Sequence, residues 1–164
     1  MANLSELERR IRVIENVEAI KRLKYRYFRH LDRKEWDDLA ACFAPQATVA
    51  YGSGRYRFEG REATLGFLRE ALGEEKGSVT AHHGHHPEIE LTGEDTARGT
   101  WALYNYMFNE RERRGIRIAA YYDDEYVRIE GRWMIGHTGY TEIFHEEWSR
   151  DDVPSLRLLA GGEV

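Results

Sequence analysis

The spacing of apolar residues changes along this chain, and this change constrains the fold more than any other feature. Up to about Phe43, apolar residues such as Ile20, Leu23 and Tyr27 recur at the three-and-four spacing of one helix face. From Val79 onward they alternate instead, which is typical of strands. We therefore expect an α+β fold, with helices first and then a sheet that curls around them to bury one face.

The helical part is expected to divide where caps and helix breakers occur. A weak amphipathic segment, Leu7 to Ile14, has Ser5 as its cap, and Asn16 marks a break before the main helix. A short helix follows Asp32 and is closed by Pro45. Charged residues expected to point away from the main helix are Lys21, Arg22, Lys24 and Arg26, and the apolar side of the short helix carries Trp36, Leu39 and Phe43.

Turn residues separate the later segments. Gly52-Ser53-Gly54 joins two short strand-like runs and predicts a hairpin. A third helix is expected from Glu62 to Leu72. Four longer runs predict an antiparallel meander: Val79 to Leu91, Thr96 to Phe108, Ile116 to Ile129 and Trp133 to Phe144.

Length and charge restrict the possible functions. The 164 residues fit one domain, 1–164, with a tail at 150–164. A net charge of −5 without a basic cluster argues against a nucleic acid or an anionic membrane as partner. No apolar run reaches the roughly 20 residues of a bilayer span, and the N-terminus lacks the layout of a secretion signal, so we expect a cytoplasmic protein. The single cysteine, Cys42, excludes an intrachain disulfide.

The end of the main helix is the first place with residues suited to acid–base chemistry. Tyr27 faces the interior, and Asp32 lies one position beyond Leu31, so its carboxylate reaches the edge of the core. An aspartate at a helix junction also serves as the cap of the following helix. The local sequence leaves both roles open.

A histidine cluster, His82 to His86, is the second such place. Strand alternation sends His82 and His86 to one face and His83 and His85 to the other, unless a bulge forms at Gly84. A solvated cluster on an edge strand is one interpretation.

A metal site is the other interpretation of the histidines. Gly77, His83, His85 and Glu90 have the spacing of a first cupin motif, whose two histidines and glutamate bind a transition metal. The second cupin motif, Pro-x-Gly followed by histidine, is missing from the sequence. A helical first third also differs from a cupin.

Several segments together resemble a known family. They are Ile20 to Phe43, Ala47 to Tyr51, the strand of His82, Thr100-Trp101, and the hairpin Arg128 to Trp133. In order and spacing they resemble the polyketide-cyclase-like (SnoaL-like) branch of the nuclear transport factor 2-like cone fold, most nearly the bile acid 7α-dehydratases and more distantly scytalone dehydratase and hexachlorocyclohexane dehydrochlorinase. The resemblance implies a cone-shaped α+β barrel, with three N-terminal helices packed in a curved, mostly antiparallel mixed sheet.

The resemblance also implies a dehydratase that uses no cofactor and no metal. Tyr27, Asp32 and His82 match catalytic positions of the family, and Tyr51 matches a substrate-binding position. His82 would take a carbon-bound proton, Asp32 would orient the imidazole, and the tyrosine hydroxyls would bind the carbonyl oxygen or the leaving hydroxyl. His85 falls on a further histidine of the pattern, without an assigned role.

Two positions depart from the family pattern. Asn105 stands where an acid is expected, and it can form hydrogen bonds but cannot carry a charge or shuttle a proton. Glu142 stands where an arginine is expected, which reverses the local charge. These departures leave open a non-catalytic small-molecule-binding cone and a ketosteroid-isomerase-like isomerase with the same base.

Aromatic residues of the later strands predict the kind of ligand. Trp101 and Tyr121 are among those expected to form an apolar wall, with Asn105 and Glu142 beside it, for a small apolar polycyclic substrate. Bulky residues are also expected on the outer face of the sheet. Such a face is usually covered by another subunit, so we expect a homo-oligomer, a trimer or a dimer.

Overall fold

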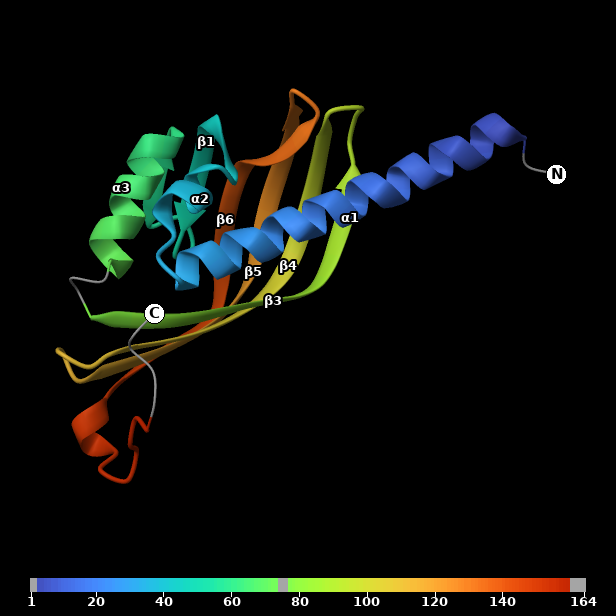
Figure 1. Cartoon of the computed structure of the whole chain (residues 1–164). Coiled ribbons are helices and arrows are strands. Elements are labelled where there is room, and N and C mark those ends of the chain that lie inside the picture. Colours follow the sequence, from blue (N-terminus) through green and yellow to red (C-terminus); the bar gives the residue numbers. More distant parts are fainter. Residues whose placement is uncertain (1–2, 74–76, 160–164) are drawn as a thin grey trace.

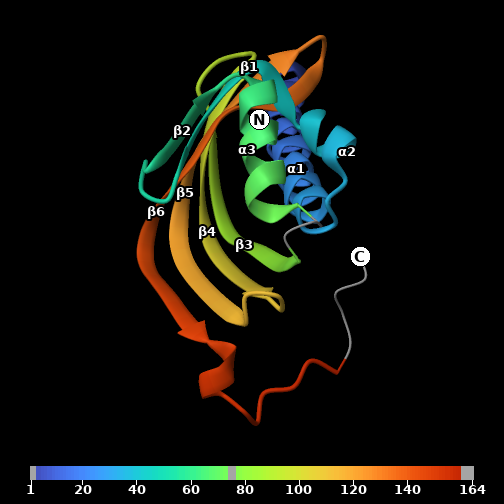
Figure 2. The ribbon, with the colours of Figure 1, turned by 90° about the vertical axis from the view of Figure 1, so that its left-hand side faces the viewer.

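The computed structural model describes residues 3–73 and 77–159, whose strands form one curved sheet around the helices (Figures 1 and 2). The strand order is β2-β1-β6-β5-β4-β3; β1 and β6 are parallel and the other neighbours are antiparallel. This confirms the expected α+β cone with a mostly antiparallel mixed sheet. The elements are α1 (Leu4–Asp32), α2 (Trp36–Ala40), β1 (Phe43–Tyr51), β2 (Tyr56–Glu59), α3 (Arg61–Leu72), β3 (Ser78–Leu91), β4 (Thr96–Asn109), β5 (Arg114–Ile129), β6 (Arg132–Ser149) and a 3-10 helix (Arg150–Asp152).

The long helix α1 lies diagonally across the concave side of the sheet, and its N-terminal half extends beyond the edge strand β3 (Figure 1). The face predicted to be apolar is buried over the C-terminal half of the helix, at Ile20, Leu23, Tyr27 and Leu31. Burial of this face against the sheet supplies most of the helix's stabilisation, because helix propensity alone is weak.

The predicted break at Asn16 is wrong, because α1 continues through it. No glycine or proline interrupts this segment, and the Asn16 side chain accepts a hydrogen bond from Trp133 Nε1 at 3.0 Å. The predicted cap is also wrong: the N-cap is Asn3, whose side chain accepts the Glu6 N–H at 2.9 Å, and Ser5 donates to the same oxygen.

The second helix is shorter than the pattern predicts. α2 ends at Ala40, and Phe43 and Pro45 belong to β1. A proline lacks a donor for a strand ladder, and the pairing of β1 with β6 shifts register between Phe43 and Thr48, where Pro45 lies. The periodic match of Phe43 to the helix was therefore local coincidence.

Strand β3 carries a bulge, at a different place from the expected one. The register with β4 shifts between His85 and Glu88, and His86 has a φ of +50°. Gly84 continues the strand instead. A Cβ at Gly84 would collide with the ring of Phe28 on α1, so the glycine allows the helix to approach β3 closely.

The ends of the described chain add two findings. Within 3–73 and 77–159, no helix is both long enough and apolar enough to cross a membrane. Part of the predicted tail, 160–164, lies outside the described residues, while 153–159 is exposed and carries no helix or strand.

Candidate active site

The carboxylate of Asp32, the last residue of α1, is held by two residues of β3. His82 Nδ1 lies 2.6 Å from Asp32 Oδ1, and the His82 backbone N–H donates to Oδ2 at 2.9 Å. Thr80 Oγ1 donates to Oδ1 at 2.8 Å. The structure thus brings together the two residues that the sequence placed at a helix end and in a histidine cluster.

This contact sets the protonation pattern of the His82 ring. An ionised carboxylate only accepts hydrogen bonds, so Nδ1 carries the proton and Nε2 is left as a basic acceptor. The His82 side chain is 7% exposed and that of Asp32 is 23% exposed. The Phe28 ring lies nearly parallel to the imidazole, at an interplanar angle of 12° and a centroid distance of 6.3 Å. The ring is therefore oriented by Asp32 and shielded from solvent.

Two residues behind Asp32 were not identified from the sequence. Lys34 Nζ donates to Thr80 Oγ1 at 3.1 Å and to the Leu31 carbonyl oxygen at 3.3 Å, and both Lys34 and Thr80 are buried. The sequence could have indicated Thr80, because residues two apart on a strand lie on the same face and Thr80 precedes His82 by two positions. Lys34 carried no such signal.

The hydroxyls of Tyr27 and Tyr51 are hydrogen-bonded to one another, at 3.2 Å. Burial raises the pKa of both phenols well above the ordinary value, so both remain protonated near neutral pH. Tyr27 also contacts Phe28, with ring centroids 5.4 Å apart. One of the two protonated phenols, Tyr27, therefore contacts the ring that packs against His82.

A second ionic pair lies deeper in the cone. Lys24, which the pattern placed outward, is fully buried, and its Nζ lies 2.8 Å from Asp124 Oδ2. Burial lowers the pKa of Lys24. The Asp124 carboxylate also accepts hydrogen bonds from Thr138 at 2.6 Å and from Tyr126 at 2.7 Å, and Lys24 Nζ lies 3.7 Å from the centroid of the Tyr122 ring. The expectation for Lys24 was wrong because its partner is a distant residue on β5.

Asn105 lies directly opposite His82, on the neighbouring strand β4. Such cross-strand pairs have Cβ atoms about 5 Å apart on one face. Asn105 is 8% exposed, and its Oδ1 has no hydrogen-bond partner within the described residues. An unsatisfied buried carbonyl is costly, so this atom is available to a ligand's donor.

The predicted wall residues Trp101 and Tyr121 do not share one environment. Trp101 is fully buried, and its Nε1 donates to Tyr126 at 2.9 Å. Tyr121 is 53% exposed, whereas the adjacent Tyr122 is buried on the inner face. This placement corrects the expectation that Tyr121 lines the interior, since strand alternation turns it outward.

Glu142 lies on β6 among cationic and polar groups. Its carboxylate is 3.2 Å from His145 Nδ1 and 4.0 Å from Arg55 Nη2, and its backbone N–H donates to Ser53 Oγ. These neighbours offset part of the charge that replaces the expected arginine.

Within the part of the chain that the structure describes, the remaining histidines of β3 belong to no group of ligand atoms close enough to hold a metal ion. As alternation predicts, His83 and His85 share a face, with nearly parallel rings 6.0 Å apart, and both are exposed. Among the described residues, the group whose ligand atoms lie close enough to hold a metal ion is a different one, His30, Glu35 and Asp38.

A curved, mostly antiparallel sheet around a long helix defines the class of α+β cone proteins, and in this chain a histidine–aspartate pair lies at the helix end. A family model described as a SnoaL-like domain matches residues 12–139. The chain belongs to this SnoaL-like family, as the resemblance implied.

Solved structures similar to this chain share the cone. They include a scytalone dehydratase candidate from Novosphingobium aromaticivorans, at 22% identity and a TM-score of 0.76 over 82% of this chain and 89% of that chain. The hexachlorocyclohexane dehydrochlorinase LinA-type3 from Novosphingobium barchaimii matches at 19% identity and 0.72, over 83% and 92%. ActVI-ORFA from Streptomyces coelicolor matches at 11% identity and 0.67, over 79% and 98%. At these identities the likeness shows the fold alone.

Proposed function

We propose that this protein is a cofactor-independent dehydratase, a carbon–oxygen lyase that removes water from a hydroxylated polycyclic or steroid-like ketone. The observation that carries the proposal is the 2.6 Å contact between His82 Nδ1 and Asp32 Oδ1, with the imidazole almost completely shielded from solvent. Such a pair suits abstraction of a carbon-bound proton, because the free Nε2 is a base and the carboxylate stabilises the imidazolium that forms.

In the proposed reaction, His82 Nε2 takes the acidic proton beside the carbonyl group. The hydroxyls of Tyr27 and Tyr51 donate hydrogen bonds to the enolate oxygen or to the departing hydroxyl. His82 returns its proton to that hydroxyl, which leaves as water when both groups depart from one face. Positioned acid–base groups contribute about 10²- to 10⁴-fold to such a reaction.

Two considerations support elimination and an apolar substrate. The names of two similar structures, a scytalone dehydratase candidate and a hexachlorocyclohexane dehydrochlorinase, describe eliminations of water and of hydrogen chloride. The His82 ring also packs against the aromatic ring of Phe28, which in turn contacts Tyr27. The substrate class of the bile acid 7α-dehydratases stays a prediction, because Asn105 and Glu142 depart from that pattern.

Asn105 favours a second candidate, an isomerase acting on a similar ketone. Moving a double bond needs a base and donors to the enolate but no acid for a leaving group, and Asn105 supplies no acid. A non-catalytic binding cone is the third outcome to be tested.

The test compares His82→Gln with His83→Gln on a panel of β-hydroxy steroid ketones. Mass spectrometry detects the loss of water, and absorbance detects a shifted double bond. We expect kcat/KM for dehydration to fall by about 10²- to 10⁴-fold in His82→Gln and to stay unchanged in His83→Gln, whose side chain is exposed on the other face. Full turnover by His82→Gln would overturn the proposal. Isomerised product of unchanged mass would favour the isomerase, and binding without turnover would favour the binding cone.

We further propose that the protein forms a homo-oligomer, a dimer or a trimer. Tyr104 and Phe144 lie on the same sheet face, because each pairs with Ala119 on the strand between them, and both are exposed. Tyr121 extends this outer face. Burial in a neighbouring copy would remove these apolar rings from water. Sedimentation equilibrium tests the proposal, and a monomer at micromolar concentration would contradict it.

A further inference from the structure

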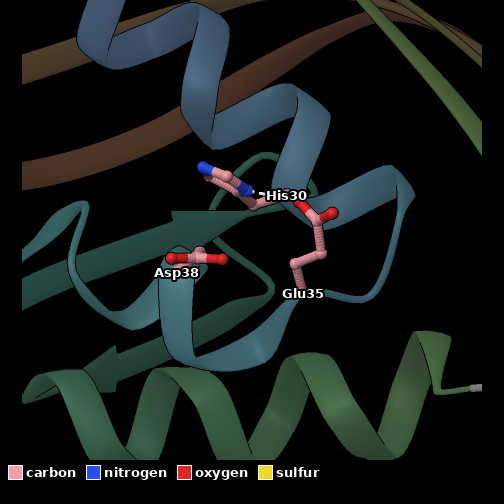
Figure 3. A group of neighbouring side chains, drawn as sticks. All are labelled: His30, Glu35 and Asp38. Atoms are coloured by element: carbon pink, nitrogen blue, oxygen red, sulfur yellow. Dashed lines mark hydrogen bonds and ion pairs between the residues drawn. The ribbon is translucent and has the colours of Figure 1, made fainter.

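The corner between α1 and α2 brings together an imidazole and two carboxylates, from His30, Glu35 and Asp38 (Figure 3). His30 Nδ1 lies 2.5 Å from Glu35 Oε2, and the three ligand atoms all lie within 4.8 Å of one another. This group is separate from the acid–base pair, whose carboxylate belongs to Asp32 and contacts β3.

Local backbone structure fixes the three positions. The Glu35 N–H donates to the His30 carbonyl oxygen at 2.9 Å, and Lys34 takes the left-handed conformation, with φ at +59°, that the tight turn requires. The Leu39 N–H donates to the Glu35 carbonyl oxygen, so Glu35 opens α2. Asp38 follows three residues later and therefore lies on the same side of that helix.

One side of this group is held by protein contacts, and the other side, at Asp38, is exposed to solvent. Arg33 Nε lies 2.9 Å from Glu35 Oε1, so the other oxygen, Oε2, is turned toward His30. The His30 side chain is only 11% exposed, whereas Asp38 is exposed. No hydrogen bond or ion pair of the Asp38 carboxylate is found within residues 3–73 and 77–159.

The spacing suits a small divalent ion after two small side-chain movements. Two ligand bonds of about 2.1 Å that meet at a tetrahedral angle hold their atoms roughly 3.4 Å apart. The present 4.8 Å limit then asks the exposed Asp38 side chain to close by at most about 1.4 Å, which a rotation of its carboxylate can supply. The His30–Glu35 contact of 2.5 Å must in turn open by about 0.9 Å, which a rotation of the Glu35 carboxylate can supply.

We propose that His30, Glu35 and Asp38 bind a divalent transition-metal ion, with Zn²⁺ the best match. An imidazole with two carboxylates is a nitrogen–oxygen ligand set that favours zinc over Ca²⁺ or Mg²⁺, which prefer oxygen ligands alone. Three protein ligands leave a position for water. The ion joins the end of α1 to the start of α2 and so holds the segment that carries Asp32. The inference does not depend on the proposed reaction.

The test titrates ZnCl₂ into the full chain, freed of tag and of metal with a chelator, by calorimetry and by thermal unfolding. We expect one Zn²⁺ per chain and a Tm increase of about 5 °C or more at a free Zn²⁺ concentration about 100 times Kd. Asp38→Asn and His30→Gln should each weaken binding by at least about 10-fold. Asp38 is exposed, so its variant keeps the test valid if His30→Gln does not fold.

Matched controls separate this site from adventitious binding. Asp37→Asn changes the adjacent exposed carboxylate, and the double variant His83→Gln/His85→Gln removes the exposed histidines of β3. Both should bind Zn²⁺ as the unaltered chain does. The inference is overturned if the unaltered chain binds no Zn²⁺ at millimolar concentration, if Asp38→Asn binds as tightly as the unaltered chain, or if binding is lost with His83 and His85 instead.

Discussion

Two of the contacts between a carboxylate and a nitrogen base, Lys24–Asp124 and His82–Asp32, are built differently. In the deeper pair, Lys24 and Asp124 are both fully buried, and Tyr126 and Thr138 supply further donors to the carboxylate. In the pair at the helix end, Asp32 is also saturated with donors, but no hydrogen bond of His82 Nε2 is found within the described residues.

This difference suits the two pairs to different roles, one structural and one in the proposed reaction. Every strong donor and acceptor of the Lys24–Asp124 pair is used inside the protein, so a substrate has no atom there to engage. In the His82–Asp32 pair, His82 Nε2 has no hydrogen bond within the described residues, and His82 lies opposite Asn105, whose buried Oδ1 has no partner there either. We infer that the Lys24–Asp124 pair stabilises the packing of the sheet on α1 and that the His82–Asp32 pair carries out the proposed reaction.

Asp32→Asn should give the largest change in activity. An amide in place of the carboxylate cannot stabilise the imidazolium and can hold the ring in the wrong tautomer, so we expect kcat to fall by about 10⁴-fold. A stopped-flow or end-point assay with a substrate that the unaltered chain dehydrates measures the change in kcat. Asp37→Asn, on the surface of α2, serves as the control. If Asp32 only tied the end of α1 to β3, kcat would change little while Tm fell.

Lys24→Met should give the largest change in stability. It leaves Asp124 charged and buried without its cation, which costs about 3–5 kcal/mol in the free energy of unfolding. Urea unfolding measures the loss. The double variant Lys24→Met/Asp124→Asn removes the uncompensated charge and should recover part of it. A loss below about 1 kcal/mol in the single variant would mean that the pair does not stabilise the cone.

Alkaline pH should destabilise the interior around the deeper pair. Burial raises the pKa of five tyrosines above the ordinary value, to about 12 for one of them: Tyr27, Tyr51, Tyr122, Tyr126 and Tyr140. Above about pH 10 these tyrosines keep their protons in the folded chain but lose them in the unfolded chain. The stabilisation that the tyrosines contribute is complete below about pH 10, and above it the free energy of unfolding falls by up to about 1.4 kcal/mol per tyrosine per pH unit. Lys24, whose pKa burial lowers, acts in the opposite direction only below its ordinary value of 10.5.

Urea unfolding between about pH 8 and pH 11, followed by tyrosinate absorbance, tests this dependence. Tyr122→Phe removes one of the contributing protons and should reduce the slope of stability against pH. A slope identical to that of the unaltered chain would show that Tyr122 titrates alike in the folded and unfolded states.

Thr80→Val should give the smallest effect and would sharpen the comparison at the helix end. It removes one of the three donors to Asp32 and also the acceptor of Lys34 Nζ, so we expect a loss of about 1–3 kcal/mol in stability and at most about 10-fold in kcat. Thr80→Ser keeps the hydroxyl and should behave as the unaltered chain. A loss in kcat as large as that of Asp32→Asn would show that the hydroxyl takes part in the chemistry itself.

Much of the fold could be predicted because it depends on local periodicity. The strand runs from Val79 onward, the hairpin at Gly52-Ser53-Gly54 and the third helix all occur where the pattern places them. Two of the errors occurred where a side chain contacts a residue distant in the sequence. Asn16 continues the helix with Trp133 as its donor, and Lys24 is buried because Asp124 compensates its charge.

The sequence by itself determined the period of most segments, the α+β plan that follows from it, and the presence of Asp32 at a helix end and of His82 on a strand, whereas the cone was what the family resemblance implied. Only the tertiary structure decided which of the histidines meets that carboxylate, that Tyr121 turns outward, and that His30 joins Glu35 and Asp38 at a corner. Periodicity is a property of neighbours along the chain, whereas a hydrogen bond between α1 and β3 depends on how the sheet curves and how closely Gly84 lets the helix approach it.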